Sequence, residues 1–450
     1  VDFTRSACGA RLHRRIAFAA LDIFLHVGLS HFTLLSRSGE KRCIVRQVIL
    51  CQHGARHRYA LARILEQQHR LKALYTDSSD HSMLGRVATF LDPLLPVPPL
   101  NRLAARRITG VPKEKVFSTD TVIIHDCLSS LFRKQVSEQT RWGTWLSSKM
   151  IHWGVEPGDI IYNMYCENLT FLQYARKIPG VTIITDMYIN PLLRDIVAQF
   201  HVADAPAPRG VDLFSKTLLR QICQLSDQIL CPSNFVREGV LKLSPETAER
   251  IRVCPYGSSL SSQKSTETVQ KGRFFWAGGT WFRKGLHLLA AVADELKKEH
   301  PDMEFRAAGI SADSVPHAEK FQNITFLGRL DRRQMLREFQ MADAFVFPSF
   351  CEGMAGVVLE AISCGCPVIT THEAGIDGII DNRNGILVPT GDVAALRAAI
   401  LHIYNDREFR NSLQEDPHAI LMNYSEEAWS DRLEVLLNSL DDMPPYSEKR

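Results

Sequence analysis

The sequence has no Cys-x-x-Cys pair, although it contains eleven cysteines, which is an odd number. The two closest, Cys364 and Cys366, flank a glycine at what reads as the end of a helix. Disulfide frameworks and zinc sites need a regular cysteine spacing, and that spacing is missing here. The pattern therefore indicates reduced cysteines in the core of a cytoplasmic protein.

Two ligand-binding motifs are absent as well. No predicted strand-end loop carries the Asp-x-Asp that holds a divalent ion, and no His/Cys cluster has zinc spacing. We therefore expect neither a bound metal nor a cofactor. Gly54 and the pair Gly278-Gly279 do not form a Gly-x-Gly-x-x-Gly loop, which argues against the dinucleotide site of a dehydrogenase.

A membrane-spanning run is also lacking. The long apolar stretch 16–35 is interrupted by Asp22, His26 and His31, whereas a transmembrane helix needs about 20 predominantly apolar residues. We expect residues 1–42 to form an N-terminal extension, interfacial or disordered, or to be sequence upstream of the functional protein. The first folded domain is expected to begin near Cys43.

The net charge of +3 is small but unevenly distributed. Residues 1–120 contain 19 Lys and Arg against 9 Asp and Glu, whereas the remaining residues contain 34 against 41. A basic N-terminal part favours an anionic partner, such as a phospholipid surface or a lipid-phosphate acceptor. A scattered, solvated basic face explains the charge equally well. Peripheral contact with the inner face of an anionic membrane is thus one of two interpretations, and no nucleic-acid partner is expected.

Short apolar runs alternate with longer helical ones from residue 44 onward, which is typical of a parallel sheet with helices on both faces. The predicted strands are 44–51, 121–125, 159–162, 182–185, 228–231 and 252–255, then 273–277, 304–308, 324–327, 344–348 and 368–370. The polar, Ser/Thr-rich segment 258–272 reads as a linker. The sequence predicts two Rossmann-like α/β domains across a cleft, 43–257 and 273–420, with an amphipathic helix 424–440 packing back on the first.

The stretch 345–367, FVFPSFCEGMAGVVLEAISCGCP, carries the most chemistry. A strand is expected to end at Pro348, and the loop after it holds Glu352 and Gly353. A helix is expected to begin near Met354, so that Met354, Ala355 and Gly356 form its start. Unpaired N–H groups at a helix start, beside a glycine, form a cradle for an anion such as a diphosphate. Glu352 can reach a sugar in the cleft, and Glu360 can accept hydrogen bonds from a ribose diol. From these residues alone, two ordinary surface glutamates are equally plausible.

A second stretch, 276–286 (WAGGTWFRKGL), places Lys284 at a helix start beside glycines. A cation there suits a leaving diphosphate, whose negative charge grows as the glycosidic bond breaks. The alternative for Arg283 and Lys284 is a solvated pair at a helix start.

Both stretches resemble the GT-B retaining glycosyltransferases of family 4, the glycosyl transferases group 1. Their signature is a Glu, seven residues and a second Glu, which matches Glu352 and Glu360, followed here by Ala361, Gly365 and Pro367. The likeness extends over roughly 226–391. It implies that Glu352 contacts the transferred sugar, that Glu360 holds the nucleotide ribose, and that Lys284 clamps the phosphates.

The resemblance also shows a departure. The family has an Arg five residues before the Lys, and this chain has Gly279 there; Arg283 is the candidate substitute because a guanidinium binds phosphate bidentately. Gly328 and Arg329, in ITFLGRL, correspond to the turn that packs against the nucleotide base.

The first-domain loop after the opening strand corresponds to CQHGARHR, where Gly54, His53 and Arg56 are the acceptor-side candidates. The family often has a His after a later strand of this domain. Here TIITDMYINP offers Asp186 or Tyr188 instead, and Asp186 is the candidate third catalytic residue beside Glu352 and Lys284.

The resemblance implies a retaining transfer of a hexose from a nucleotide-diphosphate sugar to a saccharide or lipid-linked acceptor, in polysaccharide or glycolipid biosynthesis. Two alternatives stay open: a catalytically impaired GT-B homologue that binds a nucleotide sugar, suggested by Gly279, and a GT-B sugar-nucleotide epimerase.

Overall fold

The computed structural model describes residues 45–92, 94, 101, 103–121, 124, 138–164, 168–200, 215–258, 260, 267–379, 381–414 and 417–441. The expected extension 1–42, its boundary at Cys43 and much of the linker 258–272 lie outside these residues. From Arg46 onward the described residues belong to one compact unit, which holds two parallel sheets.

The first sheet has seven strands in the order β3-β2-β1-β4-β5-β6-β7, and every pairing is parallel. The strands are β1 Val48–Gln52, β2 Leu71–Thr76, β3 Val116–Ser118, β4 Ile160–Asn163, β5 Thr182–Asp186, β6 Gln228–Cys231 and β7 Ile251–Val253. Every residue of β1, β4, β5 and β6 is buried, because helices cover both faces of the sheet.

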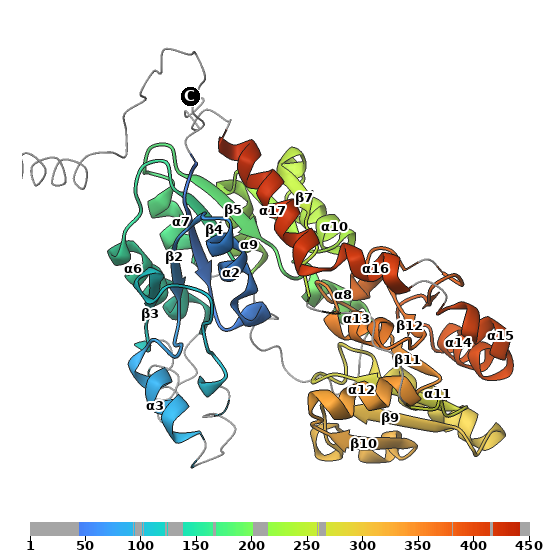
Figure 1. Cartoon of the computed structure of the whole chain (residues 1–450). Helices are drawn as coiled ribbons and strands as arrows, with labels where there is room; N and C mark the ends of the chain where they lie inside the picture. Colours follow the sequence, from blue (N-terminus) through green and yellow to red (C-terminus); the bar gives the residue numbers. More distant parts are fainter. Residues whose placement is uncertain are drawn as a thin grey trace, which may run out of the picture. The chain divides into compact units, whose positions relative to one another are not determined.

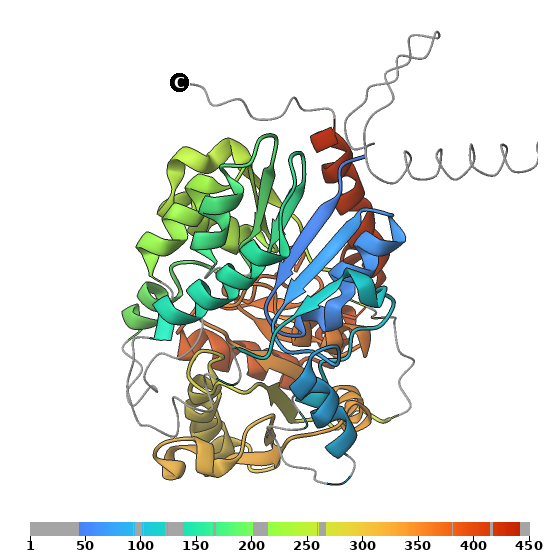
Figure 2. The same cartoon turned by 90° about the vertical axis from the view of Figure 1, so that its left-hand side faces the viewer.

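The helices that accompany this sheet are α2 Ala60–Gln67, α3 Met83–Leu91, α6 Glu138–Trp153, α7 Leu169–Ala175, α8 Leu193–Gln199, α9 Lys216–Leu225 and α10 Asn234–Leu243. The last helix of the chain, α17 Glu426–Asp441, joins them: its buried Trp429, Leu433 and Leu437 share a core cluster with Val48 and Leu50 of β1. Figures 1 and 2 show α17, in red, alongside the blue segments of the first sheet.

The second sheet has six parallel strands in the order β10-β9-β8-β11-β12-β13. These are β8 Arg273–Ala277, β9 Glu304–Ala308, β10 Ile324–Gly328, β11 Ala344–Phe347, β12 Val368–Thr370 and β13 Ile386–Leu387. Its helices are α11 Leu286–Glu299, α12 Arg332–Met341, α13 Gly356–Ser363, α14 Val393–Asn405, α15 Arg407–Ser412 and α16 Pro417–Asn423. Core clusters lie on both faces of this sheet.

Two doubly wound parallel sheets confirm the predicted α/β class. The strand expected at 121–125 is wrong: Thr121 and Ile124 are helical, and the strand of this region is β3. Strands β2, β3 and β13 were not predicted. None of the helices within the described residues has the length and apolar character to cross a bilayer.

Each sheet reverses its strand order at one point, between β1 and β4 in the first and between β8 and β11 in the second. Ligands of open α/β sheets bind beyond the carboxyl ends of strands at such points. The loop after β1 contains His53 and Gly54, the loop after β8 contains Lys284, and the loop after β11 contains Glu352. The topology therefore places the predicted site residues where such a fold binds its ligands.

Candidate active site

Two cationic side chains converge on one carboxylate between the loops that follow β8 and β11. Glu352 Oε1 lies 2.8 Å from Lys284 Nζ and 2.8 Å from Arg283 Nη1. All three side chains are largely buried, with 12% of Glu352, 15% of Arg283 and 16% of Lys284 exposed. The cluster carries one net positive charge, so it can attract an anion while Glu352 is already held in position.

The charge states follow from this geometry. Burial on its own raises the pKa of Glu352, but the charges of Lys284 and Arg283 outweigh it and hold that pKa below its usual value. Burial lowers the pKa of Lys284, and the nearby Arg283 lowers it further, whereas Glu352 opposes both effects. Glu352 is therefore an acceptor-only carboxylate, ready to take hydrogen bonds from sugar hydroxyls.

Backbone contacts fix the two loops against each other. The carbonyl oxygen of Arg283 accepts hydrogen bonds from Phe350 N at 2.9 Å and from the Ser349 hydroxyl at 3.2 Å. Gly285 has a φ of 70°, and a Cβ there would lie 2.1 Å from Pro348 O. Only glycine fits this position, so the close approach of the loops depends on it.

The amides at the start of α13 differ in whether the protein itself binds them. Ala355 N donates to Ala374 O at 2.9 Å, so this amide is occupied by the protein itself. Among the described residues no acceptor faces the amides of Met354, Gly356 and Val357. These three N–H groups, at the positive end of the helix dipole, are the part of the proposed anion cradle that the protein leaves available.

Gly353 has a different surrounding from the one expected. A Cβ at this position would lie 1.8 Å from Tyr188 O, a backbone atom of the first α/β half. The Gly353 carbonyl accepts the Ser233 hydroxyl at 2.7 Å. The missing side chain thus makes room for the loop after β5, and Gly353 joins the two halves of the chain beside Glu352.

A groove of about 590 Å³ brings together another subset of the candidates. Glu360, Met354 and Gly356 line it, together with Arg58 from the first half and Arg332 from α12. Partial burial raises the pKa of Glu360, while the charges of Arg332 and Arg58 lower it. The groove thus presents a carboxylate near two arginines, with residues from the start of α13 in its wall.

Three further donor-side candidates, like Arg283, Gly353 and Ala355, do not line this groove. Gly328 has a φ of 64° and open space around its missing Cβ, and its carbonyl accepts Gly309 N at 2.7 Å. Arg329 is exposed. Gly279 is exposed too, and no atom lies within 4 Å of the position that a Cβ would take, so a larger side chain fits there.

The acceptor-side candidates surround a carboxylate that the sequence did not single out. Gly54 N donates to Asp77 Oδ1 at 2.9 Å, and His53 Nε2 lies 3.2 Å from Asp77 Oδ2. Arg106 also contacts Asp77, and Arg56 stacks over the Tyr188 ring at 3.6 Å. Asp77 comes directly after β2. An acidic residue at the end of a strand is the sequence feature that could have identified it as a candidate.

Residues 57–59 of the same loop are strained. His57, Arg58 and Tyr59 have φ angles of 47°, 51° and 58°, in the left-handed region that costs a non-glycine residue free energy. The turn directs Arg58 to the groove that Glu360 lines. Strain maintained by surrounding structure often marks a functional position, so Arg58 joins the candidates.

Asp186 lies apart from the Lys284–Glu352 cluster. Its carboxylate is 1% exposed and accepts the hydroxyls of Tyr162, at 3.0 Å, and Tyr256, at 2.5 Å. Burial raises its pKa to about 6, although both hydroxyls lower it. Both carboxylate oxygens are engaged in the core, and a role for Asp186 in turnover stays a prediction.

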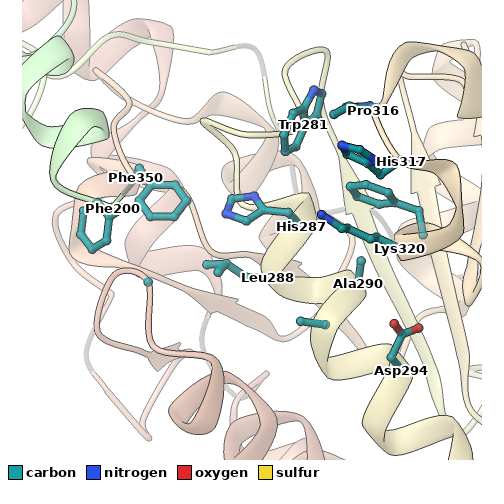
Figure 3. A pocket seen from close by; sticks show the side chains of 13 residues that line it. Phe200, Trp281, His287, Leu288, Ala290, Asp294, Pro316, His317, Lys320 and Phe350 are labelled. Carbon is teal, nitrogen blue, oxygen red and sulfur yellow. The ribbon is translucent and has the colours of Figure 1, made fainter. Parts of the chain in front are cut away.

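A separate pocket of about 410 Å³ contains none of the predicted residues. Figure 3 shows Phe200, Phe350, His287 and Trp281 around it; the Phe200 and Phe350 rings are 4.6 Å apart, and His287 stacks on Phe350 at 5.5 Å. Trp281 shortly precedes Lys284 in the sequence, and Phe350 shortly precedes Glu352. We interpret this aromatic packing as support for the two catalytic loops.

Part of this chain is similar in sequence to known proteins. Residues 271–406 match the family described as Glycosyl transferases group 1. Glycogen synthase of Mycobacterium tuberculosis is 30% identical over 138 residues, covering 29% of this chain and 33% of that protein. O-antigen chain mannosyltransferase B of Escherichia coli is 32% identical over 249 residues, covering 50% of this chain and 65% of that protein. The chain thus spans from a third to about two thirds of these relatives.

Solved structures share the whole architecture. Anabaena HepE, crystallised with UDP and glucose, has a TM-score of 0.56 at 15% identity, covering 88% of this chain and all of that one. Sucrose-phosphate synthase of Thermosynechococcus elongatus has a TM-score of 0.56 at 17% identity, covering 88% and 99%. The fold is GT-B, as predicted, with two Rossmann-like units.

Proposed function

We propose that this chain is a retaining glycosyltransferase that moves a hexose from a nucleoside-diphosphate sugar to a saccharide or lipid-linked acceptor. One observation carries the proposal: Lys284 and Arg283 meet Glu352 at the carboxyl ends of β8 and β11, the strands that flank the switch point. The match of residues 271–406 to Glycosyl transferases group 1 supports it.

The proposed step needs no metal ion. Lys284 and Arg283 turn from Glu352 to the diphosphate, whose charge they and the open amides of α13 stabilise. Glu352 then accepts hydrogen bonds from the hexose, and Glu360 from the ribose. The bond between the anomeric carbon and the phosphate oxygen breaks with its electron pair on the phosphate. The acceptor oxygen attacks from the same face and gives its proton to the departing phosphate, which retains the configuration.

Product analysis tests the function directly. The chain is incubated with UDP-hexoses and GDP-hexoses, with and without saccharide and lipid-linked acceptors, and the products are identified by mass spectrometry. UDP-glucose is the first donor to test, because HepE binds UDP and glucose in the same fold. We expect release of the nucleoside diphosphate and a hexosylated acceptor. An isomerised donor without acceptor would instead indicate the epimerase, and calorimetric binding without any release the impaired homologue.

The missing arginine at Gly279 gives a second, sharper test. If Arg283 carries the charge that the family places at this position, Arg283→Ala should lower kcat/KM about ten- to a hundredfold. Adding Gly279→Arg should restore most of that loss, because the position has open space and no positive φ. Gly279→Ala in the same background is the control and should restore nothing. An unchanged rate in Arg283→Ala would show that Arg283 is not the substitute.

A further inference from the structure

Helix α3 exposes most of its large apolar side chains, whereas its two leucines are half-buried. Met83 is 78% exposed, Val87 45%, Phe90 74%, and Leu94, just after the helix, 67%. Their spacings of four, three and four residues place them on one face. The face that packs on the protein has small residues instead, Gly85 and Ala88. This is the reverse of the pattern of a surface helix in a globular protein, whose large apolar residues face the core.

The orientation of α3 is fixed by its attachment. A Cβ at Gly85 would lie 1.8 Å from Ser79 O, so the helix rests directly on the loop before it. The Ser82 side chain caps the helix by accepting from Gly85 N, and Leu84 N donates to Asp120 Oδ2 at 2.8 Å. Because this packing leaves no room for rotation, the apolar face stays directed outward. Contiguous apolar patches of this kind mark interaction sites.

Exposed arginines occur on α3 and on a segment that contacts the loop before it. Arg86 lies on α3 itself. Arg107 is exposed on a second segment, and the residues on either side of it contact the loop before α3. In that contact Asp80 N donates to Arg106 O at 3.2 Å, and Ile108 N donates to Asp80 Oδ1 at 3.1 Å. Apolar side chains flanked by arginines match the interface of an anionic bilayer, where the former enter the acyl region and the latter meet headgroup phosphates.

The same loop connects α3 to the acceptor-side candidates. It begins at Asp77, which accepts from Gly54 N and pairs with His53. We propose that α3 inserts its outer face into the surface of an anionic bilayer and thereby places the loop of His53 and Gly54 at that surface, where it receives a lipid-anchored acceptor. The acceptor part rests on the transferase function proposed above, whereas the bilayer contact does not.

Vesicle binding of the whole chain tests the contact. Sedimentation uses vesicles of phosphatidylcholine with phosphatidylglycerol, and vesicles of phosphatidylcholine alone. Met83→Ser with Phe90→Ser should reduce binding to the anionic vesicles by at least about tenfold, because two large apolar side chains no longer enter the bilayer. Arg86→Glu should reduce binding to the anionic vesicles only. The matched control is Val435→Ser, since Val435 is 72% exposed but lies on α17; it should bind as the unchanged chain does.

Several outcomes overturn the proposal. Unreduced binding of the double variant, an equal loss in Val435→Ser, or no vesicle binding by the unchanged chain would each do so. A dimer in gel filtration that the double variant disperses, without vesicle binding, would identify a second copy of the chain as the occupant. The thermal midpoint of each variant is compared with that of the unchanged chain. Nucleotide release from a sugar donor, measured with saccharide acceptors and with lipid-linked acceptors in detergent instead of vesicles, tests the transferase function separately from the bilayer contact.

Discussion

We expect the replacement of Lys284 with alanine to lower kcat about a hundred- to a thousandfold while the protein stays folded. Removing one donor that stabilises the developing charge of a leaving group has an effect of this size. The fold should survive because Arg283 Nη1, which lies 2.8 Å from Glu352 Oε1 in the unchanged chain, leaves the buried carboxylate a cationic partner. Steady-state kinetics with the donor identified by product analysis measures the change, and far-UV circular dichroism checks the fold.

Lys298→Ala is the control for this prediction. Lys298 is an exposed lysine in the last turn of α11, the helix that Lys284 precedes, so its removal changes the net charge equally and should leave kcat unaltered. Glu352→Gln should lower kcat as well, since the amide presents one acceptor oxygen where the carboxylate presents two. Near-normal turnover in both Lys284→Ala and Glu352→Gln would show that the cluster is not the catalytic site.

Replacing Gly285 with alanine should destabilise the protein by about 2–5 kcal/mol, which combines the cost of a left-handed residue with that of overpacking. Its φ is 70°, and its Cβ would meet Pro348 O at 2.1 Å, a backbone atom that cannot turn away. The measurement is the free energy of unfolding from urea titration, with the slope compared between variants.

Gly365→Ala separates the two costs. Gly365 has nearly the same φ, 69°, but no atom lies within 4 Å of its Cβ position. Its replacement should therefore cost about 1–2 kcal/mol, the left-handed penalty alone. Equal losses in the two variants would mean that the contact between the loops after β8 and β11 is not tight.

The strands that could be predicted are those buried on both faces. β5, β6 and β8 are fully buried runs bounded by polar loops, and the structure places them where the sequence does. β2 was not predicted because Lys72 interrupts the apolar run LKALYT. In the structure Lys72 Nζ donates to Asp159 Oδ1 at 2.8 Å, while Leu71 and Leu74 are buried. β3 has three half-buried residues at the sheet edge, which give no periodic signal.

The candidate site could be predicted where its residues lie in recognisable sequence motifs. Lys284 and Glu352 are 68 residues apart, and their meeting follows from parallel strands that end at one edge of a sheet. Asp77 was missed together with β2, because an acidic residue after an unpredicted strand has no context. The contact of Gly353 with Tyr188 O joins distant segments through a backbone atom, which no side-chain pattern encodes.

The position of α17 has a mechanical consequence. Arg46, just before β1, donates to Leu440 O at 3.2 Å, and Arg70 pairs with Asp441 at 2.6 Å, so the end of the described chain is fastened beside its beginning. The polypeptide therefore passes between the two α/β halves twice, once before β8 and once before α17. Two connections restrain the movement of one half against the other more than a single linker would.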